Sequence, residues 1–286
     1  MSARPFRSVL YIPGSKERAL EKARELPADA IIFDLEDAVA PEEKDRAREL
    51  LAQVLETTDY GGRARIVRVN GLDTDWGRKD IAAFVGAGIE AVLIPKVSRA
   101  EDVEAVAALI PGTPLWAMME TALGMLNAAG IAAHPRMAGM VMGTNDLAKE
   151  LGSRFRPDRL AMQSGLGLCL LAARAHGLTI VDGVYNAFKD DEGLRAECEQ
   201  GRDMGFDGKT LIHPAQIGIA NAAFAPSEAE IDLARRQIEA FEAAQRQGQG
   251  VAVVDGRIVE NLHIVTARAT LAKAEAIAKL AGGASL

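Results

Sequence analysis

Short apolar runs recur along the chain, each followed by a turn and then by a segment with apolar residues at helical spacing. This is the pattern of repeated β-strand and α-helix units. Eight such runs are present: Ser8–Ile12, Ala30–Asp34, Arg65–Val69, Ala91–Pro95, Leu115–Met119, Gly139–Met142, Leu178–Asp182 and Gly208–Ile212. Eight strands with right-handed helical crossovers close naturally into an α/β fold of the (β/α)8 barrel type. A doubly wound open sheet competes, but no GxGxxG motif follows an early strand to support it.

The pattern changes after the eighth run. Ser227 and Glu230 have the spacing of a capping box, which predicts a helix to about Arg246. A flexible segment over 247–250 follows, and the stretch 251–259 predicts a short β-hairpin around an Asp-Gly turn. A last Ala-rich helix is expected over about 262–280. We therefore expect a catalytic barrel over residues 1–225, and a C-terminal lid extension over residues 226–286 that packs on a neighbouring subunit.

Composition narrows the possible partners. The 286 residues include 49% hydrophobic ones, enough for one sizeable core, and the net charge is -7. This acidic balance makes nucleic acid or an anionic membrane an unexpected main partner. No run reaches the ~20 apolar residues that cross a bilayer, and the N-terminal residues lack an apolar signal core, so we expect a cytoplasmic protein. Cys169 and Cys198 show no zinc spacing and are expected to be buried thiols.

Polar residues stand where the predicted strands end, which is where barrels of this kind carry their active sites. The set comprises Asp34, Glu36, Asp37, Arg68, Asn70, Lys96, Glu120, Thr121, Thr144, Asn145, Asp146, Asp182 and His213. A strand-end Asp or Thr can also serve only as the cap of the next helix. The number of such residues favours a functional site.

Two acids in this set are candidate metal ligands. Glu120 and Asp146 follow adjacent strands, so their carboxylates can reach one ion without backbone strain. Ligation by oxygen atoms alone suits Mg²⁺, which keeps several waters and leaves positions for a substrate. Glu36 and Asp37 would then support the site by hydrogen bonds to Arg68 or to metal-bound waters. An N-cap or loop ion pair remains the alternative for Asp37.

Arg68 interrupts an otherwise apolar strand, so a cation inside the barrel there needs an anionic partner. Its guanidinium fork suits a substrate carboxylate or an enolate oxygen, and an ion pair with Glu36 is the structural alternative. Lys96 is expected to balance the acidic cluster rather than to form a Schiff base. The segment Gly143–Asp146 places small residues and backbone N–H groups where they can hold a carboxylate. His213, before a proline, is expected to be structural.

Seven motifs together resemble the citrate lyase beta-subunit-like family of the HpcH/HpaI aldolase and citrate lyase superfamily. They are RSVLYIPG (7–14), FDLEDAV (33–39), RVN (68–70), LIPK (93–96), META (119–122), GTNDL (143–147) and IHPAQI (212–217). Each motif alone is weak, but the ordered set is specific and covers nearly the whole chain.

This resemblance implies a TIM barrel, usually a homotrimer, with a hexamer as the alternative. It implies magnesium at Glu120 and Asp146, substrate contacts from Arg68, and a CoA-thioester or oxoacid substrate such as malyl-, citramalyl- or citryl-CoA. The implied reaction is a retro-aldol cleavage, in which magnesium and Arg68 stabilise charge as the carbon–carbon bond breaks. Gly143, Thr144 and Asn145 would contact the substrate.

The sequence departs from the family at one position. Relatives with a C-terminal lid commonly carry an aspartate in a Gly-x-Met-Ile-Asp-x-Pro segment, which is supplied to the neighbouring subunit as a proposed acid or base. Here Glu260 stands at that position and Leu262 replaces the proline. The extra methylene matters, because a misplacement on the order of 1 Å can cost ~10²-fold in rate. Asp182, Glu36 and Glu260 are all candidates for the group that takes the proton.

The same residues also fit other functions. A malyl- or citramalyl-CoA thioesterase would use the same metal and the same pocket. A beta subunit of a citrate lyase complex would act on a carrier-protein thioester instead of CoA. A non-catalytic trimeric scaffold is a further alternative, against which Arg68, Glu120 and Asp146 argue.

Overall fold

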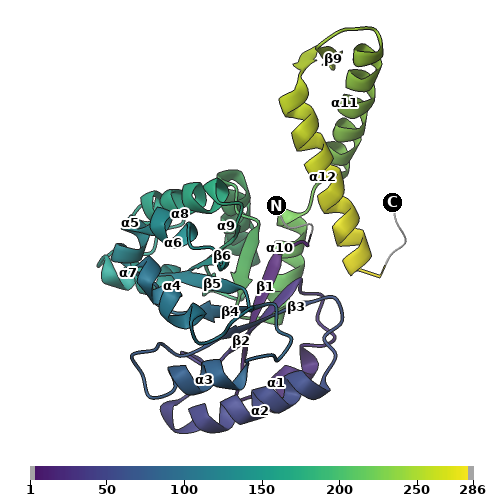
Figure 1. Cartoon of the computed structure of the whole chain (residues 1–286). Coiled ribbons are helices and arrows are strands. Elements are labelled where there is room, and N and C mark those ends of the chain that lie inside the picture. The colour runs from purple at the N-terminus through teal and green to yellow at the C-terminus, as the bar shows by residue number, and fades with distance from the viewer. Residues whose placement is uncertain (1–3, 283–286) are drawn as a thin grey trace. The chain divides into compact units, whose positions relative to one another are not determined.

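The computed structural model describes residues 4–282 and shows a closed barrel of eight parallel strands in chain order (Figure 1). The strands are β1 (Ser8–Pro13), β2 (Ala30–Asp34), β3 (Ala64–Arg68), β4 (Ala91–Ile94), β5 (Leu115–Met119), β6 (Met137–Met142), β7 (Thr179–Asp182) and β8 (Gly208–Leu211). β8 pairs with β1, which closes the barrel. The (β/α)8 prediction is therefore confirmed.

Helices surround the strands on the outside (Figure 1). They are α1 (Glu17–Lys22), α2 (Lys44–Thr57), α3 (Gly77–Ala83), α4 (Ala100–Ala107), α5 (Ala122–Leu126), α6 (Ala128–Ala132), α7 (Thr144–Glu150), α8 (Gln163–Ala175), α9 (Asp191–Met204) and α10 (Ile217–Phe224). Single 3₁₀ turns cover Pro41–Glu43 and Pro214–Gln216. No helix among residues 4–282 has the length and apolar character that crossing a membrane requires.

Alternation along each strand separates two apolar layers. Successive side chains of a strand point to opposite faces, so Ile32 faces the barrel interior while Ile31 and Phe33 pack against the helices. The rings of Phe6 and Trp116, 5.2 Å apart, fill part of the interior. Any polar residue in register with the interior set must therefore lie in the lumen of the barrel.

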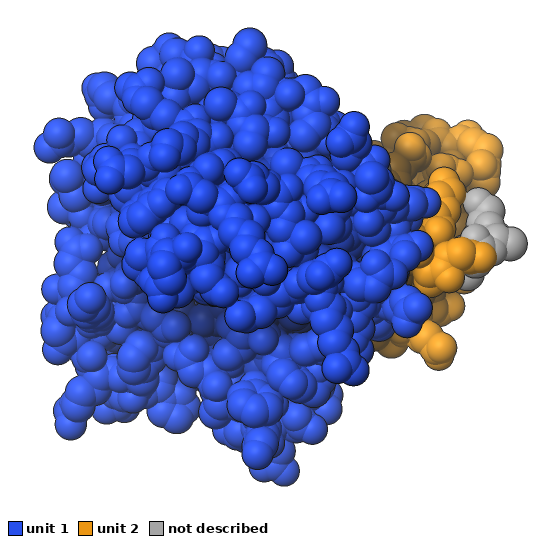
Figure 2. All heavy atoms as spheres, turned by 90° about the horizontal axis from the view of Figure 1, so that it is seen from below, with its two compact units in different colours: residues 1, 6–224 blue, residues 2–5, 225–286 orange. Residues whose placement is uncertain are grey.

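The chain divides into two compact units, coloured separately in Figure 2. Among the described residues, the barrel unit contains Phe6–Phe224, and the second unit contains residues 225–282 together with residues 4–5. Within the second unit, α11 (Glu228–Arg246) packs against α12 (Asn261–Leu280), and β9 (Ala252–Val254) pairs with β10 (Arg257–Val259). The predicted order of helix, hairpin and helix is confirmed.

The second unit has its own small core, formed by Phe241, Ala244, Ala252, Val254, Val259 and Ile264. Its first helix begins with the predicted capping box, in which Ser227 Oγ accepts the N–H of Glu230 and the Glu230 carboxylate accepts the N–H of Ser227. The hairpin turn places Asp255 and Gly256 at positive φ, as a two-residue turn of this type requires. Asp255 also pairs with Arg236 of α11 at 2.8 Å.

Candidate active site at the carboxyl ends of the strands

Arg68 lies at the end of β3 and, being in register with Ile66, points into the lumen. It is 6% exposed, and its Nε and Nη2 donate to the two carboxylate oxygens of Asp34 at 2.7 and 2.5 Å. Its Nη1 is 2.9 Å from Glu36 Oε2. Burial alone would lower the pKa of Arg68, but the charge and hydrogen bonds of Asp34 raise it well above the ordinary value. The residue is thus a permanent, fixed cation.

Glu120 follows β5 and continues the inward register of Trp116 and Met118. It is 2% exposed, and its Oε1 accepts the backbone N–H of Lys96 at 2.8 Å. Burial raises the pKa of Glu120 to about 7, and the nearby acids Glu36 and Asp146 add to this rise while Lys96 and Arg68 oppose it. The positive charge near Glu120 is therefore too small to offset the cost of burying its carboxylate.

Asp146 lies in the first turn of α7 and is half-buried. Glu120, Asp146 and Arg68 all line one cavity of about 290 Å³. No cluster of three or more His, Cys, Asp or Glu side chains suited to a metal occurs within residues 4–282. The acid pair alone nevertheless fits Mg²⁺, because this ion often uses one or two carboxylates and keeps several waters. The raised pKa of Glu120 is consistent with a site that a divalent cation would complete.

Gly143 allows Glu120 to occupy this place. A Cβ atom at position 143 would lie 2.4 Å from Glu120 Cβ and 2.6 Å from its Oε2. The Gly143 N–H also donates to Met119 O at 2.8 Å, which joins the end of β6 to the end of β5. Gly143, Thr144 and Asn145 line the same cavity as the two acids. The Asn145 side chain exchanges two hydrogen bonds with Asn186, at 2.8 and 3.2 Å.

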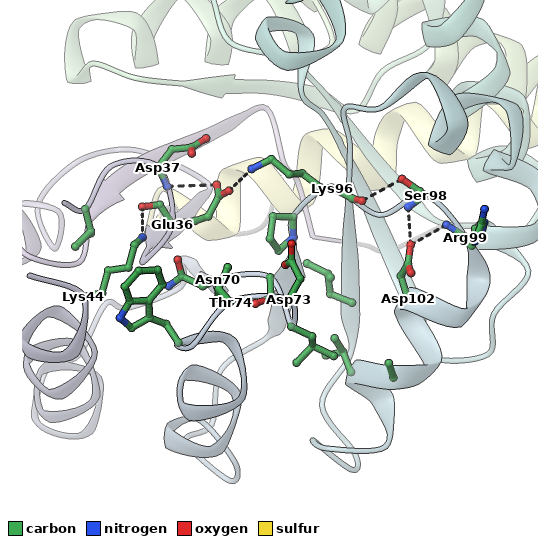
Figure 3. A pocket seen from close by; sticks show the side chains of 18 of the residues that line it. Glu36, Asp37, Lys44, Asn70, Asp73, Thr74, Lys96, Ser98, Arg99 and Asp102 are labelled. Carbon is green, nitrogen blue, oxygen red and sulfur yellow. Dashed lines mark hydrogen bonds and ion pairs between the residues drawn. The ribbon is translucent and has the colours of Figure 1, made fainter. Parts of the chain in front are cut away.

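A chain of alternating charges supports the site. Lys96 Nζ is 2.6 Å from Glu36 Oε1 (Figure 3). The other oxygen of Glu36 faces Arg68. Asp37 is more exposed, and its carboxylate is 3.7 Å from Arg68. Burial lowers the pKa of Lys96, but the hydrogen bond and charge of Glu36 outweigh this effect and raise it. A protonated amine is a poor nucleophile, which agrees with the supporting role expected for Lys96.

A second, larger cavity of about 800 Å³ adjoins this charge chain. Glu36, Asp37 and Lys96 lie on its wall (Figure 3). Trp76 also lines it, and the Trp76 ring faces Lys44 Nζ at 5.3 Å. Arg99 and Asp102 lie on the opposite side in Figure 3, where the Asp102 carboxylate accepts the N–H groups of Ser98 and Arg99. Asp37 lines both cavities.

The structure does not bring Asp182 to the site. Val181 belongs to the lumen, so Asp182 points the other way, toward the helices, where it lies 2.7 Å from Arg159 and 3.3 Å from Lys209. It is fully buried and does not line either cavity. Burial would raise its pKa, but Lys209 and Arg159 together hold it below the ordinary value. The prediction that Asp182 is a catalytic base is therefore corrected to a structural ion pair.

His213, Glu260 and the two cysteines line neither cavity. His213 Nδ1 accepts the Ala215 N–H at 3.2 Å and caps a 3₁₀ turn, which is a structural role as expected. Glu260 lies in the second unit, where it is exposed and its N–H donates to His263 Nδ1 at 3.0 Å. Both cysteines are buried, and burial raises the pKa of each thiol to about 12.

Sequence reasoning missed several residues that line the small cavity. These are Tyr11, Met118, Met142, Val184 and Ile212. Strand alternation carried a usable signal for two of them, because Tyr11 is in register with Val9, and Met118 is in register with Trp116. Their apolar character made them resemble ordinary core residues.

Comparison with known proteins agrees with this architecture. The fold and the cavity define a (β/α)8-barrel enzyme with its site at the carboxyl ends of the strands. A sequence model described as HpcH/HpaI aldolase/citrate lyase matches residues 7–214, and the chain belongs to this family.

Individual relatives cover nearly the whole chain. This chain is 82% identical over 276 residues to a (3S)-malyl-CoA thioesterase from Cereibacter sphaeroides, and the match spans 96% of this chain and 97% of that protein. It is 37% identical to the citrate lyase subunit beta of Escherichia coli, spanning 95% and 94% of the two chains. The crystal structure of CitE from Mycobacterium tuberculosis with magnesium, acetoacetate and coenzyme A superposes with a TM-score of 0.80 at 31% identity, covering 96% and 99%.

Proposed function

We propose that this protein is a magnesium-dependent thioesterase that hydrolyses a 3-hydroxyacyl-CoA, with malyl-CoA as the first substrate to test. The observation that carries the proposal is the 82% identity to (3S)-malyl-CoA thioesterases over almost the full length of both chains. The small cavity, with its buried cation and two acids, suits a short acyl group that carries a carboxylate. The lyase reaction, which the sequence motifs favoured, becomes the second candidate.

Magnesium fits the acid pair Glu120 and Asp146, and M. tuberculosis CitE has been solved with this ion. Bound there, the ion would polarise substrate oxygens and neutralise charge that develops on them. The chain's own residues would hold the substrate. Arg68 would face its oxygens as a fixed cation, and Gly143, Thr144 and Asn145 would form the cavity wall beside it. Glu36 and Lys96 would keep Arg68 and Glu120 in position.

The hydrolytic reaction consumes one water. The water oxygen bonds to the thioester carbonyl carbon, the carbon–sulfur bond breaks, and the water's proton passes to the leaving thiolate. The products are a free hydroxy acid and CoA. With Asp182 removed from the candidates for the base, Glu36 and Glu260 remain. Glu36 is already paired with Arg68 and Lys96, so we favour Glu260.

Glu260 requires a second subunit in this proposal, and we propose a homotrimer in which each C-terminal unit covers a neighbour's site. Large apolar side chains surround Glu260 and face solvent in the single chain. Ile258, Leu262 and Val265 are between 61% and 71% exposed, and Val253, which pairs with Ile258, is 66% exposed. Exposed apolar groups of this kind mark protein interfaces. Light scattering of the purified protein tests the assembly, and a monomer would refute it.

Product analysis tests the reaction. The purified protein with Mg²⁺ is incubated with malyl-CoA, and the products are separated by chromatography. Hydrolysis gives malate and free CoA, whereas carbon–carbon cleavage gives glyoxylate and acetyl-CoA. Free CoA without acetyl-CoA supports the thioesterase activity. Acetyl-CoA as the main product would refute that activity and support the lyase activity instead. Citramalyl-CoA and citryl-CoA in parallel assays define the acyl preference.

The lyase remains a specific second candidate, because the chain shares the family and 37% identity with a citrate lyase subunit beta. Such a subunit within a citrate lyase complex would act on a citryl carrier protein. Turnover of citryl carrier protein, with none of the CoA thioesters consumed, would support that assignment.

A further inference from the structure

The half-buried side chain of Tyr11 lines the small cavity from the barrel lumen. Tyr11 lies on β1 and points into the lumen, where its ring packs with the interior apolar cluster. The ring faces the Arg68 guanidinium, with 5.1 Å between the guanidinium carbon and the ring centroid. Its hydroxyl reaches across the barrel to Met118 of β5. Both residues line the cavity that holds Arg68 and Glu120.

The Tyr11 hydroxyl lacks a strong partner within the described residues 4–282. The Tyr11 hydroxyl donates to Met118 Sδ at 3.5 Å, and a thioether sulfur is a weak acceptor. Buried tyrosine hydroxyls usually find a better partner. Burial raises the pKa of Tyr11 and outweighs the opposing effect of the Arg68 charge, so the phenol stays protonated. The Tyr11 hydroxyl can therefore donate a hydrogen bond to a stronger acceptor on a substrate.

The exposure of the lining residues shows which end of the cavity is deep. Arg68 and Glu120 are almost completely buried, whereas Asn145 and Ile212 are exposed and form the mouth. A cavity of about 290 Å³ is far too small for coenzyme A, so the acyl group must enter first. For malyl-CoA the leading end carries the hydroxyl and the carboxylate. This end would come to lie beside Arg68, whose guanidinium faces the Tyr11 ring.

We propose that the Tyr11 hydroxyl donates a hydrogen bond to the carboxylate of the acyl group and thereby selects thioesters that carry one. The inference rests on the proposed function. Asp34 and Glu36 already engage the Arg68 guanidinium on three of its nitrogens, so its capacity for a substrate is limited. Met118, Met142 and Val184 add an apolar wall without a strong donor. Tyr11 supplies a neutral donor directly beside the Arg68 guanidinium.

Tyr11→Phe in the full-length protein tests this directly, because phenylalanine keeps the ring against Arg68 and removes only the hydroxyl. We expect KM for malyl-CoA to rise about 10- to 100-fold, as for a lost hydrogen bond to a charged group, with kcat changed less than about threefold. Hydrolysis of 3-hydroxybutyryl-CoA, which lacks the carboxylate, should be the same in both proteins. An unchanged KM, or equal losses on both thioesters, would overturn the assignment.

A control variant separates this role from a structural one. Tyr60→Phe removes a buried hydroxyl that donates to Leu20 O away from both cavities, and it should leave KM unchanged. A KM increase in Tyr60→Phe as large as that in Tyr11→Phe would show that the effect does not depend on contact with the substrate, and would contradict the proposal.

Calorimetry with malate and Mg²⁺ keeps this inference distinguishable from the proposed function. Malate presents the same hydroxyl and carboxylate without requiring turnover. We expect Kd for malate to be about tenfold higher in Tyr11→Phe than in the unaltered protein. Equal affinities, or no binding of malate to the unaltered protein, would overturn the role of Tyr11. Absence of free CoA in the malyl-CoA assay would overturn only the thioesterase.

Discussion

Arg68 and Asp34 occupy paired positions on neighbouring strands, and Arg68 donates two hydrogen bonds to the Asp34 carboxylate at the top of the barrel lumen. The pairing register of β2 and β3 sets this contact, so the cation is oriented before any substrate arrives. A planar guanidinium held by two parallel bonds has little freedom to turn. The remaining nitrogen faces Glu36, which links Arg68 to Lys96 and so to the backbone that holds Glu120.

Asp34→Asn should destabilise the protein by about 3 kcal/mol, because it leaves a buried cation with less compensation. Chemical denaturation followed by circular dichroism measures the change. Asp45→Asn is the matched control, since Asp45 pairs with Arg48 at the protein surface and should show no measurable effect. Equal unfolding midpoints for the unaltered protein and Asp34→Asn would show that the lumen pair adds no net stability.

Glu120→Gln should abolish Mg²⁺ binding and lower turnover by at least ~10³-fold, because the amide keeps the shape and removes the charge that a hard cation requires. Isothermal titration with MgCl₂ measures binding separately from activity. Glu104→Gln serves as a control, because Glu104 pairs with His134 on the surface. Retained magnesium affinity in Glu120→Gln would remove this residue from the metal site.

Gly143→Ala should lower kcat/KM by more than ~10-fold, because the new Cβ would overlap Glu120 Cβ, which cannot move without its backbone. Gly130→Ala, in α6 with open space around the added atom, should instead keep full activity and stabilise the protein by about 0.5 kcal/mol. Steady-state kinetics and thermal denaturation of both variants check the pair. Full activity in Gly143→Ala would mean that Glu120 does not need its observed position.

Asp182→Asn should cost about 3 kcal/mol at pH 7, because Lys209 and Arg159 lose their shared carboxylate. The folded-state pKa of Asp182 lies below its ordinary value of 3.8, so its stabilisation is complete above that value and is lost as the pH falls through the folded pKa. The difference in unfolding free energy between the two proteins should therefore be constant from pH 7 to about 5 and shrink in stronger acid. A difference that grows on acidification would reverse this assignment.

Asp182 also shows where sequence reasoning reached its limit. The apolar runs predicted all eight strands to within two residues of their observed ends, because buried parallel strands leave a strong hydrophobic signal. The same rule of alternation places Glu120 inward with Met118, and Asp182 outward beside an inward Val181. Position at a strand end, taken without the inward or outward direction of the side chain, selects Asp182 as a site candidate and does not select Tyr11.

The Lys96 contact to Glu120 was not predictable from the sequence. Lys96 adopts φ of 52°, which is uncommon for a residue with a side chain, and this conformation accompanies the hydrogen bond from its N–H to Glu120. The sequence gives no local reason, such as a glycine or asparagine, to expect it. The surrounding barrel imposes it, since a conformation of this kind persists only where tertiary contacts determine it.

Glu260→Ala should lower kcat for malyl-CoA by at least ~10²-fold and change KM by less than about threefold, because an acid or base that acts only in the transition state adds nothing to substrate binding. Glu260→Asp shortens the side chain by one methylene and should recover part of the activity. Because Glu260 is proposed to act in a neighbour's site, mixing inactive Glu260→Ala with inactive Arg68→Ala after dissociation and reassembly should restore activity. Some mixed trimers would contain one site with both residues intact. Recovery in the mixture supports a shared site, whereas an unchanged kcat in Glu260→Ala would remove Glu260 from the mechanism.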